Sequence, residues 1–298
     1  MLLKTTIKKL LKTTLIMFII LSISTIPLIN KNNSNILRTS LEIEDITSIP
    51  TNSIYLLNKE NLLLKVNVFL KNQNSISEII NYLTINNSNI PVELNGYIPI
   101  KAKLLSSKVE NKIAYLDFSK ELLTSSKKKN QQIISGIVYS LLEINNIENV
   151  MITIDKEQIK GYSGLLNKSI GINQTYEVNN RHDINRIVIY YLDKENKYYL
   201  PITKYLNDKR EKIEIIIEEL KNPKNPNLVS PLDIHTNLLS YKEESNVLFL
   251  NFNHYLLDKN QEVNRKILDM ISVSAFENYD VNMVMFEVND KELEYRKR

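Results

Sequence analysis

"IAYLDFSKELL", residues 113–123, returns as "VLFLNFNHYLL", residues 247–257, in this chain of 298 residues. When residues 104–154 are laid on residues 238–288 without a gap, 16 of the 51 positions are identical. The offset of 134 residues is far longer than the roughly 20–50 residues of solenoid repeats. The sequence therefore predicts two copies of one domain, and the length has room for both.

Each copy reads as a strand, a helix, a hairpin, a second helix and a last strand. First strands are expected at 62–70 and 186–192, and last strands in "NVMITI" and "MVMFEV". In the hairpin, "KLLSS" and "NLLSY" precede the two phrases quoted above. Alternation in "IAYLDF" places Ala114, Leu116 and Phe118 on one apolar face, as in a strand buried on one side.

Capping boxes predict where the first helix of each copy begins. Ser75 is followed by Glu78, and Asp208 by Glu211, at the spacing that satisfies the free N–H groups of a first turn. Apolar residues follow at the i, i+3, i+4, i+7 spacing of one buried helix face. The expected core positions are Ile76, Ile79, Ile80, Leu83, Ile133, Ile134, Ile137, Val138 and Leu141, and Ile213, Ile216, Ile217, Leu220, Ile267, Leu268, Ile271 and Ala275.

The first thirty residues combine a basic start with an apolar run. Four lysines and no acid occur in the first twelve residues, and the apolar run covers about residues 13–29. Its length is at the short end of the roughly 17–25 residues that span a bilayer, and the lysines should stay cytoplasmic. A cleaved signal peptide is the alternative, although no A-x-A-like pair follows the run. We expect an uncleaved anchor through Leu15, Ile16, Met17, Phe18, Ile19, Ile20 and Leu21.

These features together predict an α+β chain behind an N-terminal anchor. The order is β-α-β-β-α-β, twice, with each copy a small mixed sheet carrying two helices on one face. Residues 1–30 form the anchor or signal, 31–53 a polar tether, 54–160 the first domain, 161–184 a linker, and 185–293 the second domain.

Charge and cysteine content exclude several classes of function. The chain has 38 basic and 34 acidic residues, and removing the four lysines of the first twelve residues leaves 34 of each. A neutral remainder lacks the basic footprint of a nucleic-acid-binding protein. There are no cysteines, so disulfides, thiolate metal sites and a cysteine nucleophile are absent.

Few polar residues are candidates for chemistry. Asp117 lies inside a strand, but the second copy has Asn251 there, which keeps an acceptor and loses the charge. We therefore expect Asp117 to face outward or to cap the turn that follows. His182, His235 and His254 have no metal-ligand spacing, and no hydrolase or phosphate-binding motif occurs. The sequence predicts no catalytic residue, no metal site and no cofactor.

The basic stretch "SSKKKN", residues 125–130, could contact phosphates or anionic lipid. It falls before the second helix of the first copy, where the second copy reads "KNQEVN". A solvated loop explains it more simply.

The segment "KLLSSKVENKIAYLDFSKELL", residues 103–123, resembles the GerMN domain family, whose members occur in tandem in sporulation and germination proteins. The resemblance covers roughly 54–160 and 185–293. It implies an exported, membrane-associated protein of endospore-forming bacteria, with a fold related to ring-building domains and a role in protein contact. Family members often carry a lipid-anchoring cysteine. This chain has none, so anchoring would rest on residues 13–29.

We therefore expect a non-enzymatic, membrane-anchored protein of sporulation or germination, with its bulk outside the cytoplasmic membrane. Its partners would be that membrane and other envelope proteins between mother cell and forespore, with no nucleic acid, and self-association is left open. The alternative is an extracellular module that binds cell-wall glycan or peptide. Secretion after signal cleavage is the alternative localisation.

Overall fold

Each repeat opens with a hairpin, and the computed structural model describes residues 51–72, 75–177 and 184–298. The predicted anchor and most of the tether fall outside these ranges. From Thr51 onward the chain forms one compact unit. The first repeat contains β1 (Thr51–Leu57), β2 (Leu63–Phe69), α3 (Ile76–Tyr82), β3 (Leu104–Glu110), β4 (Ile113–Phe118), the 3₁₀ turn η1 (Lys120–Leu122), α4 (Lys127–Leu141), β5 (Asn149–Ile154) and β6 (Glu157–Gln158).

The second repeat follows the same plan. A short 3₁₀ turn, η2 (Lys168–Ile170), and a short strand, β7 (Thr175–Glu177), precede it. Its elements are β8 (Asn185–Leu192), β9 (Tyr199–Leu206), α5 (Lys212–Lys221), β10 (Leu238–Glu244), β11 (Val247–Phe252), η3 (His254–Leu256), α6 (Arg265–Asn278), β12 (Met283–Val288) and β13 (Lys291–Lys297).

The mixed sheets of the two repeats have the same topology. β3-β4-β5-β6 and β10-β11-β12-β13 each pair antiparallel, parallel and antiparallel in turn. Both carry a register shift at the same place, between Leu104 and Ser106 and between Leu238 and Ser240. The predicted α+β class with two repeated domains and small mixed sheets is confirmed.

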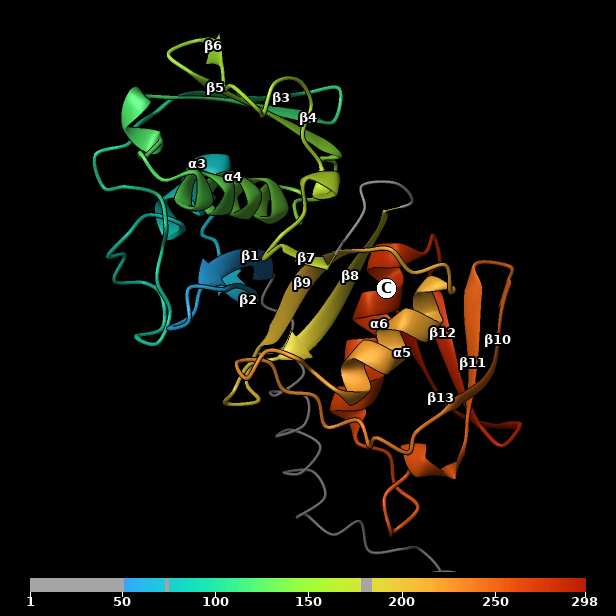
Figure 1. The fold of residues 1–298 in the computed structure, drawn as a ribbon. Coiled ribbons are helices and arrows are strands. Elements are labelled where there is room, and N and C mark those ends of the chain that lie inside the picture. Colours follow the sequence, from blue (N-terminus) through green and yellow to red (C-terminus); the bar gives the residue numbers. More distant parts are fainter. Residues whose placement is uncertain (1–50, 73–74, 178–183) are drawn as a thin grey trace, which may run out of the picture. The chain divides into compact units, whose positions relative to one another are not determined.

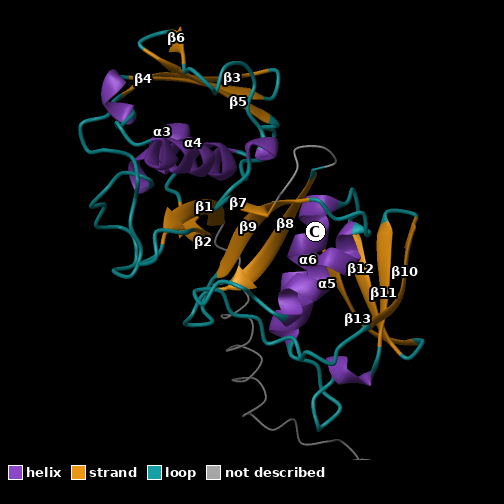
Figure 2. Cartoon of the chain, viewed as in Figure 1, coloured by secondary structure: helices purple, strands orange, loops and turns teal. Residues whose placement is uncertain are grey.

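The helices are covered on both sides, in contrast to the expected single sheet with helices on one face. The opening hairpin of each repeat forms a separate sheet, β1-β2 in the first and β8-β9, joined by β7, in the second. α4 contacts both β1 and β5, and α6 contacts both β8 and β12. Figures 1 and 2 show the helices of each repeat between its hairpin and its four-stranded sheet. A helix between two apolar surfaces can bury most of its circumference, which explains why Ser272 and Ser274 of α6 are also buried.

The predicted core positions are confirmed. All seventeen apolar helix residues expected in the core are buried, as are Ala114, Leu116 and Phe118 of β4. At about 25 cal/mol for each Å² of apolar surface removed from water, these side chains supply the main favourable term in folding. The period-3.6 and period-2 patterns therefore located the core correctly.

The helix starts agree with prediction in one repeat only. Ser75 is the N-cap of α3, and its side chain accepts the N–H of Glu78 at 3.4 Å. In the second repeat the N-cap is Glu211, which forms a capping box with Glu214, so the predicted start at Asp208 is three residues early. Asp208 instead binds Arg210 through the backbone N–H and the guanidinium, which holds the preceding turn.

The predicted first strands turned out to be different members of the opening hairpin. Residues 62–70 correspond to β2, whereas residues 186–192 correspond to β8, whose counterpart is β1. The first strand starts at Thr51, inside the expected tether. The similar turns "NKEN" at 58–61 and "DKEN" at 193–196 lie between the two strands of each hairpin. The order in each repeat is therefore β-β-α-β-β-α-β-β.

Part of the expected linker is held by the second repeat. β7 pairs in parallel with Lys204–Leu206 of β9, and Ile172 is fully buried. The backbone N–H of Ile172 donates to Oγ1 of Thr203, and the N–H of Thr203 donates to the carbonyl of Ile172, each at 2.9 Å. Residues 161–177 thus contain ordered structure that contributes to the core.

Candidate functional site

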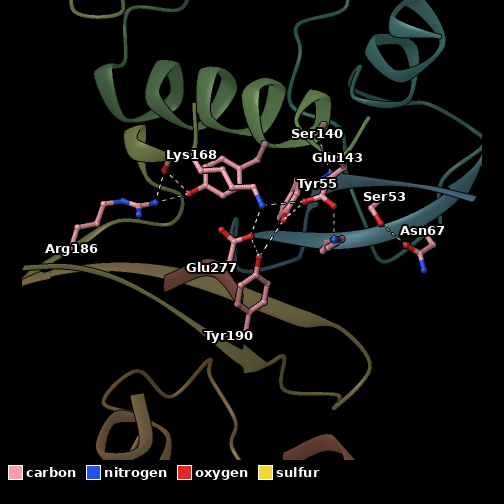
Figure 3. Close-up of polar contacts among 11 residues, drawn as sticks. Ser53, Tyr55, Asn67, Ser140, Glu143, Lys168, Arg186, Tyr190 and Glu277 are labelled. Carbon is pink, nitrogen blue, oxygen red and sulfur yellow. Dashed lines mark hydrogen bonds and ion pairs between the residues drawn. The ribbon is translucent and has the colours of Figure 1, made fainter. Parts of the chain in front are cut away.

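Two tyrosines at equivalent positions of the repeats contact each other between the repeats. Tyr55 of β1 donates its backbone N–H to Ser140 of α4, and Tyr190 of β8 donates its own to Ser274 of α6, each at 2.9 Å. Both tyrosines and both serines are buried. The phenol oxygens of Tyr55 and Tyr190 lie 3.3 Å apart (Figure 3). The same local arrangement occurs in both repeats and brings the two phenol groups into contact.

Two glutamates and a lysine complete this group, which we call the junction cluster: Tyr55, Tyr190, Glu143, Glu277 and Lys168. Tyr55 donates to Glu143 at 3.4 Å, and Tyr190 donates to Glu277 at 3.5 Å. The Nζ atom of Lys168 lies 3.5 Å from Glu143 and forms a closer ion pair with Glu277. Figure 3 shows the ammonium between the two carboxylates. The lysine comes from η2, which lies between the two repeats.

Charge in the junction cluster is balanced by a second lysine. Lys65 of β2 contacts Glu143 at 2.6 Å, so two ammonium groups face two carboxylates. Burial alone would raise the pKa of Glu143, but Lys168 and Lys65 outweigh it and hold that pKa below its usual value. Burial raises the pKa of both phenols well above the usual value, so they stay protonated and can donate.

The backbone of Lys168 is also held in place. Its carbonyl accepts the phenol of Tyr139 at 2.9 Å and the guanidinium of Arg186. Arg186 lies 3.2 Å from the Tyr139 oxygen as well, and the rings of Tyr139 and Tyr55 meet edge-on at 5.5 Å. These contacts fix the position of η2, and thereby place the ammonium of Lys168 between the glutamates.

A cavity of about 1040 Å³ opens beside the junction cluster and is lined by both repeats. β2 contributes Lys65 and Asn67, and the turn and start of β9 contribute residues 197–199. Leu142, Val273 and Phe276 supply apolar wall. A volume of this order is at the upper end of known ligand pockets, roughly 300–1,000 Å³.

The outer faces of the two four-stranded sheets carry the same row of side chains. On the first, Lys108 Nζ lies 4.9 Å from the ring centre of Tyr115, and the backbone register sets Tyr115 beside Met151. On the second, Lys242 lies 4.7 Å from the ring centre of Phe249, which is beside Met285. Lys108 pairs with Glu110 at 2.7 Å, and Lys242 with Glu244 at 3.0 Å. We call these two rows the outer-face rows.

Asp117 braces a turn within its own sheet. The side chain is buried, accepts the hydroxyl of Thr153 at 2.6 Å and accepts the N–H of Lys156 at 2.8 Å, and these two bonds lower its pKa. As expected, Asp117 lies on the outer face of the sheet with Tyr115. The expectation of a cap on the turn after β4 is wrong, because the turn that Asp117 holds joins β5 to β6 and covers its carboxylate. Asn251 does the same in the second repeat, since its Oδ1 accepts the N–H of Asp290 at 3.1 Å.

His235 and His254 both lie against the ring of Tyr255, with ring centres 5.3 Å and 4.1 Å from it. His235 is exposed and also contacts Asp233 at 2.9 Å. His182 lies outside the described residues. Among the residues that the structure describes, no group of three or more His, Cys, Asp or Glu side chains is arranged to hold a metal ion.

The lysines of "SSKKKN" belong to the first turn of α4 and not to a loop, because the helix begins at Lys127 with Ser126 as its N-cap. The predicted anchor residues Leu15–Leu21 lie outside the described ranges. In the part of the chain that the structure describes, no helix is long and apolar enough to cross a membrane.

A protein-family model described as "Germane: Sporulation and spore germination" matches this chain twice, over residues 53–160 and 188–294. The two matches cover more than half of the sequence and fall on the two repeats. The chain belongs to this family. A search of curated proteins gives no match.

The fold of this Germane family member is also found among solved structures. The tandem GerMN domains of the sporulation protein GerM from Bacillus subtilis superpose with a TM-score of 0.74 at 23% identity, covering 81% of this chain and 92% of that one. The first GerMN domain of the same protein matches at 18% identity, with a TM-score of 0.35, 38% of this chain and 89% of that one. A putative lipoprotein from Clostridium perfringens matches at 22% identity, with a TM-score of 0.29 and coverages of 40% and 88%. The first of these shows a common tandem fold.

The sequence contained one signal for the junction cluster that could have been used. Ser140/Ser274 and Glu143/Glu277 are identities between the repeats at polar positions in, or just after, the apolar stretches of α4 and α6. Polar residues kept in both copies of a buried helix need buried partners. Lys168 could not have been found in this way, because it lies between the repeats.

Proposed function

We propose that this Germane family protein acts without catalysis, outside the cytoplasmic membrane, by contacts with other proteins during sporulation or germination. In this proposal residues 13–29 anchor it, and it helps to assemble an envelope complex between mother cell and forespore. The observation that carries the proposal is the duplicated outer surface of the two sheets. β3 and β10 are exposed along most of their length, and both lie at the edge of a sheet.

An exposed edge strand can pair with a strand of another protein. Leu105 and Val109 on β3, and Leu239 and Tyr241 on β10, are each 39–54% exposed, so apolar contact area is available. Lysines on the same strands disfavour indiscriminate edge pairing. The outer-face rows next to these edges would add half-buried aromatic and methionine contacts, which are enriched at interfaces.

The charge balance predicts how such contacts respond to salt. The chain after residue 12 is neutral, so long-range charge should steer association only weakly. Apolar and backbone contacts should survive about 0.5 M salt, where the Debye length has fallen to roughly 4 Å.

The test is a pull-down of the full chain from sporulating cells at low and at high salt. We expect specific proteins to be retained at both. Val109→Asp with Tyr241→Asp should release them, because a carboxylate on each edge opposes pairing. The matched control is Lys259→Asp with Lys291→Asp, which changes two exposed residues away from β3 and β10. Loss of every partner in high salt, or equal retention by both double variants, would exclude the edge mechanism.

The anchor has its own measurement. Mass spectrometry of the native N-terminus should find residues 13–29 attached, because no small-residue cleavage signal follows them. A mature chain that starts after residue 25 would instead identify a cleaved signal and a secreted protein.

A second candidate function is binding of cell-wall glycan or peptide. It is favoured by a group of exposed rings in the second repeat: Tyr255 is 45% exposed and lies 5.3 Å from His235 and 4.1 Å from His254. Stacked sugar rings use such surfaces. Sedimentation with insoluble cell wall, lost in Tyr255→Ala and kept in the edge variant, would favour this candidate over assembly.

A further inference from the structure

The free edge of β2 faces the cavity beside the junction cluster. β1 and β2 form a two-stranded sheet, and β9, which lies near the other side of β2, is not hydrogen-bonded to it as a strand in the described part of the chain. Leu63 uses that side: its N–H donates to the side chain of Asn173 at 2.9 Å, and its carbonyl accepts from the same side chain at 2.6 Å. Backbone groups alternate along an antiparallel strand, so Lys65 and Asn67 direct theirs to the same side.

β9 offers a matching edge. The carbonyl of Pro201 accepts from Asn173 at 2.8 Å, on the side of β9 away from β8. By the same alternation, Tyr199 directs its backbone groups to this side. The amide of Asn173 thus stands where one peptide group of an intervening strand would stand, between β2 and β9. Beyond it, Lys65, Asn67 and Tyr199 line the cavity.

The cavity has a net positive lining, although the chain after residue 12 is neutral as a whole. Five basic side chains line it, Lys65, Lys168, Lys197, Lys297 and Arg298, against two acidic ones, Glu143 and Glu277. Lys65 and Lys168 are already paired with the glutamates, and Lys197 pairs with Glu93. Among the described residues, Lys297 and Arg298 have no carboxylate of another residue within ion-pair distance, and both are exposed.

We propose that this cavity binds an extended acidic peptide segment of a partner protein, added as a strand to the free edge of β2. The proposal rests on the protein-contact function above and names the chemistry of one partner. The backbone of Lys65 and Asn67 would pair with the peptide backbone. Acidic side chains of the peptide would meet Lys297 and Arg298, and alternate apolar side chains would meet Val273 and Phe276.

An inorganic anion or a compact headgroup would leave much of this site unused. It would satisfy the two free cations but would contact neither the strand edge nor the apolar wall. An extended peptide can do all three, because its backbone hydrogen bonds supply affinity and its alternate side chains supply specificity. The charge complementarity should make binding faster and tighter at low salt.

The test is fluorescence anisotropy with the full chain in detergent and a labelled ten-residue peptide of alternating Glu and Val. We expect saturable binding that weakens at least tenfold between low salt and about 0.5 M, because the charges are exposed. A peptide of alternating Lys and Val should bind at least tenfold more weakly. The Glu–Val peptide with every backbone nitrogen methylated should also lose binding, since it keeps the charge and cannot form a strand.

Lys297→Glu with Arg298→Glu should weaken binding of the Glu–Val peptide at least tenfold and improve that of the Lys–Val peptide. The matched control is Lys259→Glu with Lys291→Glu, because Lys291 lies at the opposite end of β13 and neither residue lines the cavity. Thermal melts of both variants exclude loss of folding. Equal binding of the methylated peptide, or no effect of the first double variant, overturns the proposal.

The outcome is separable from that of the proposed function. If the Glu–Val peptide does not bind but partners are still retained in high-salt pull-downs, the acidic-peptide site is excluded and the edge contacts of β3 and β10 are supported. If the peptide binds as expected but no partner is retained at high salt, the edge mechanism is excluded and the acidic-peptide site is supported.

Discussion

The phenol oxygens of Tyr55 and Tyr190 lie 3.3 Å apart, although the residues are 135 positions apart in the chain. Each belongs to the same three-residue arrangement, Tyr55 with Ser140 and Glu143, and Tyr190 with Ser274 and Glu277. The duplicated residues therefore contact each other across the junction of the repeats, and Lys168 binds both glutamates from outside the duplication. This arrangement ties the stability of the pair to a few buried polar side chains.

Removing one phenol should cost stability, and removing both should cost less than the sum. Tyr55→Phe and Tyr190→Phe each delete a buried hydroxyl that donates to a glutamate, worth about 1 kcal/mol. Because the two hydroxyls also contact each other, the double variant should be non-additive. Urea unfolding of the four proteins measures this. Tyr115→Phe is the control, since the other repeat has Phe249 there; additive costs would mean that the phenols are independent.

Lys168→Met should destabilise the protein by about 2–3 kcal/mol. It leaves Glu277 without its ammonium partner and Glu143 with Lys65 alone, and a largely buried carboxylate without its partner is costly. Adding Glu277→Gln should restore part of the loss, because an amide in that place is neutral. The comparison is made by thermal melts at pH 7. A double variant that melts lower than Lys168→Met would contradict the assigned pairing.

Low pH should destabilise the folded protein at the junction cluster, because Glu143 becomes protonated. Its folded pKa is depressed, so its contribution is present above the unfolded value, about 4.3, and is lost as pH falls through the folded value. Melting midpoints from pH 7 to pH 3 should therefore drop more for the natural protein than for Glu143→Gln. In Lys168→Met only Lys65 still opposes the effect of burial on the pKa of Glu143, so that pKa is depressed less. The drop in melting midpoint between pH 7 and pH 3 should therefore be smaller. Parallel curves for all three proteins would show that Glu143 titrates alike in the folded and unfolded chain.

Asp117→Asn should be tolerated, and Asp117→Ala should not. Asn251 holds the equivalent turn of the second repeat with an amide, so the hydrogen bonds and not the charge are required. We expect less than about 0.5 kcal/mol for the Asn variant and about 1–2 kcal/mol for the Ala variant, which leaves the N–H of Lys156 unpaired. If Asp117→Asn abolished function in sporulating cells while folding and partner binding were kept, the carboxylate would have a chemical role.

The sequence predicted the parts of the fold that depend on local patterns. The apolar stripes of the helices and of β4 have a period that fixes their buried face. The sequence did not show that β2 is the second strand of its hairpin and β8 the first strand of its own, because both are short apolar runs. In addition, Pro201 lies within β9, and a proline is usually taken as the end of a strand. The similar turns were the available clue, since "NKEN" precedes β2 whereas "DKEN" follows β8.

The junction cluster could be predicted only in part, for a physical reason. Ser140 and Glu143 repeat as Ser274 and Glu277, but repetition does not tell whether two copies touch. Which phenol meets which depends on how the hairpins approach each other, through contacts such as those of Asn173 and Lys168 that occur once. Single-copy residues between the repeats carry no repeat signal.

The segment between the repeats should stabilise the second repeat measurably. A fragment of residues 161–298 keeps Ile172 and β7, whereas residues 185–298 lack both and leave the hydroxyl of Thr203 and the outer edge of β9 without their partners. Burying one isoleucine contributes about 1.5–3 kcal/mol, and the lost strand pairing adds to this. The longer fragment should therefore melt several degrees higher. Ile172→Ala in the longer fragment is the matched control. It should lower the melting temperature of that fragment most of the way to that of the shorter one. Equal melting of both fragments would mean that the second repeat folds independently of residues 161–184, and in the intact chain limited proteolysis would then be expected to cut first within that segment.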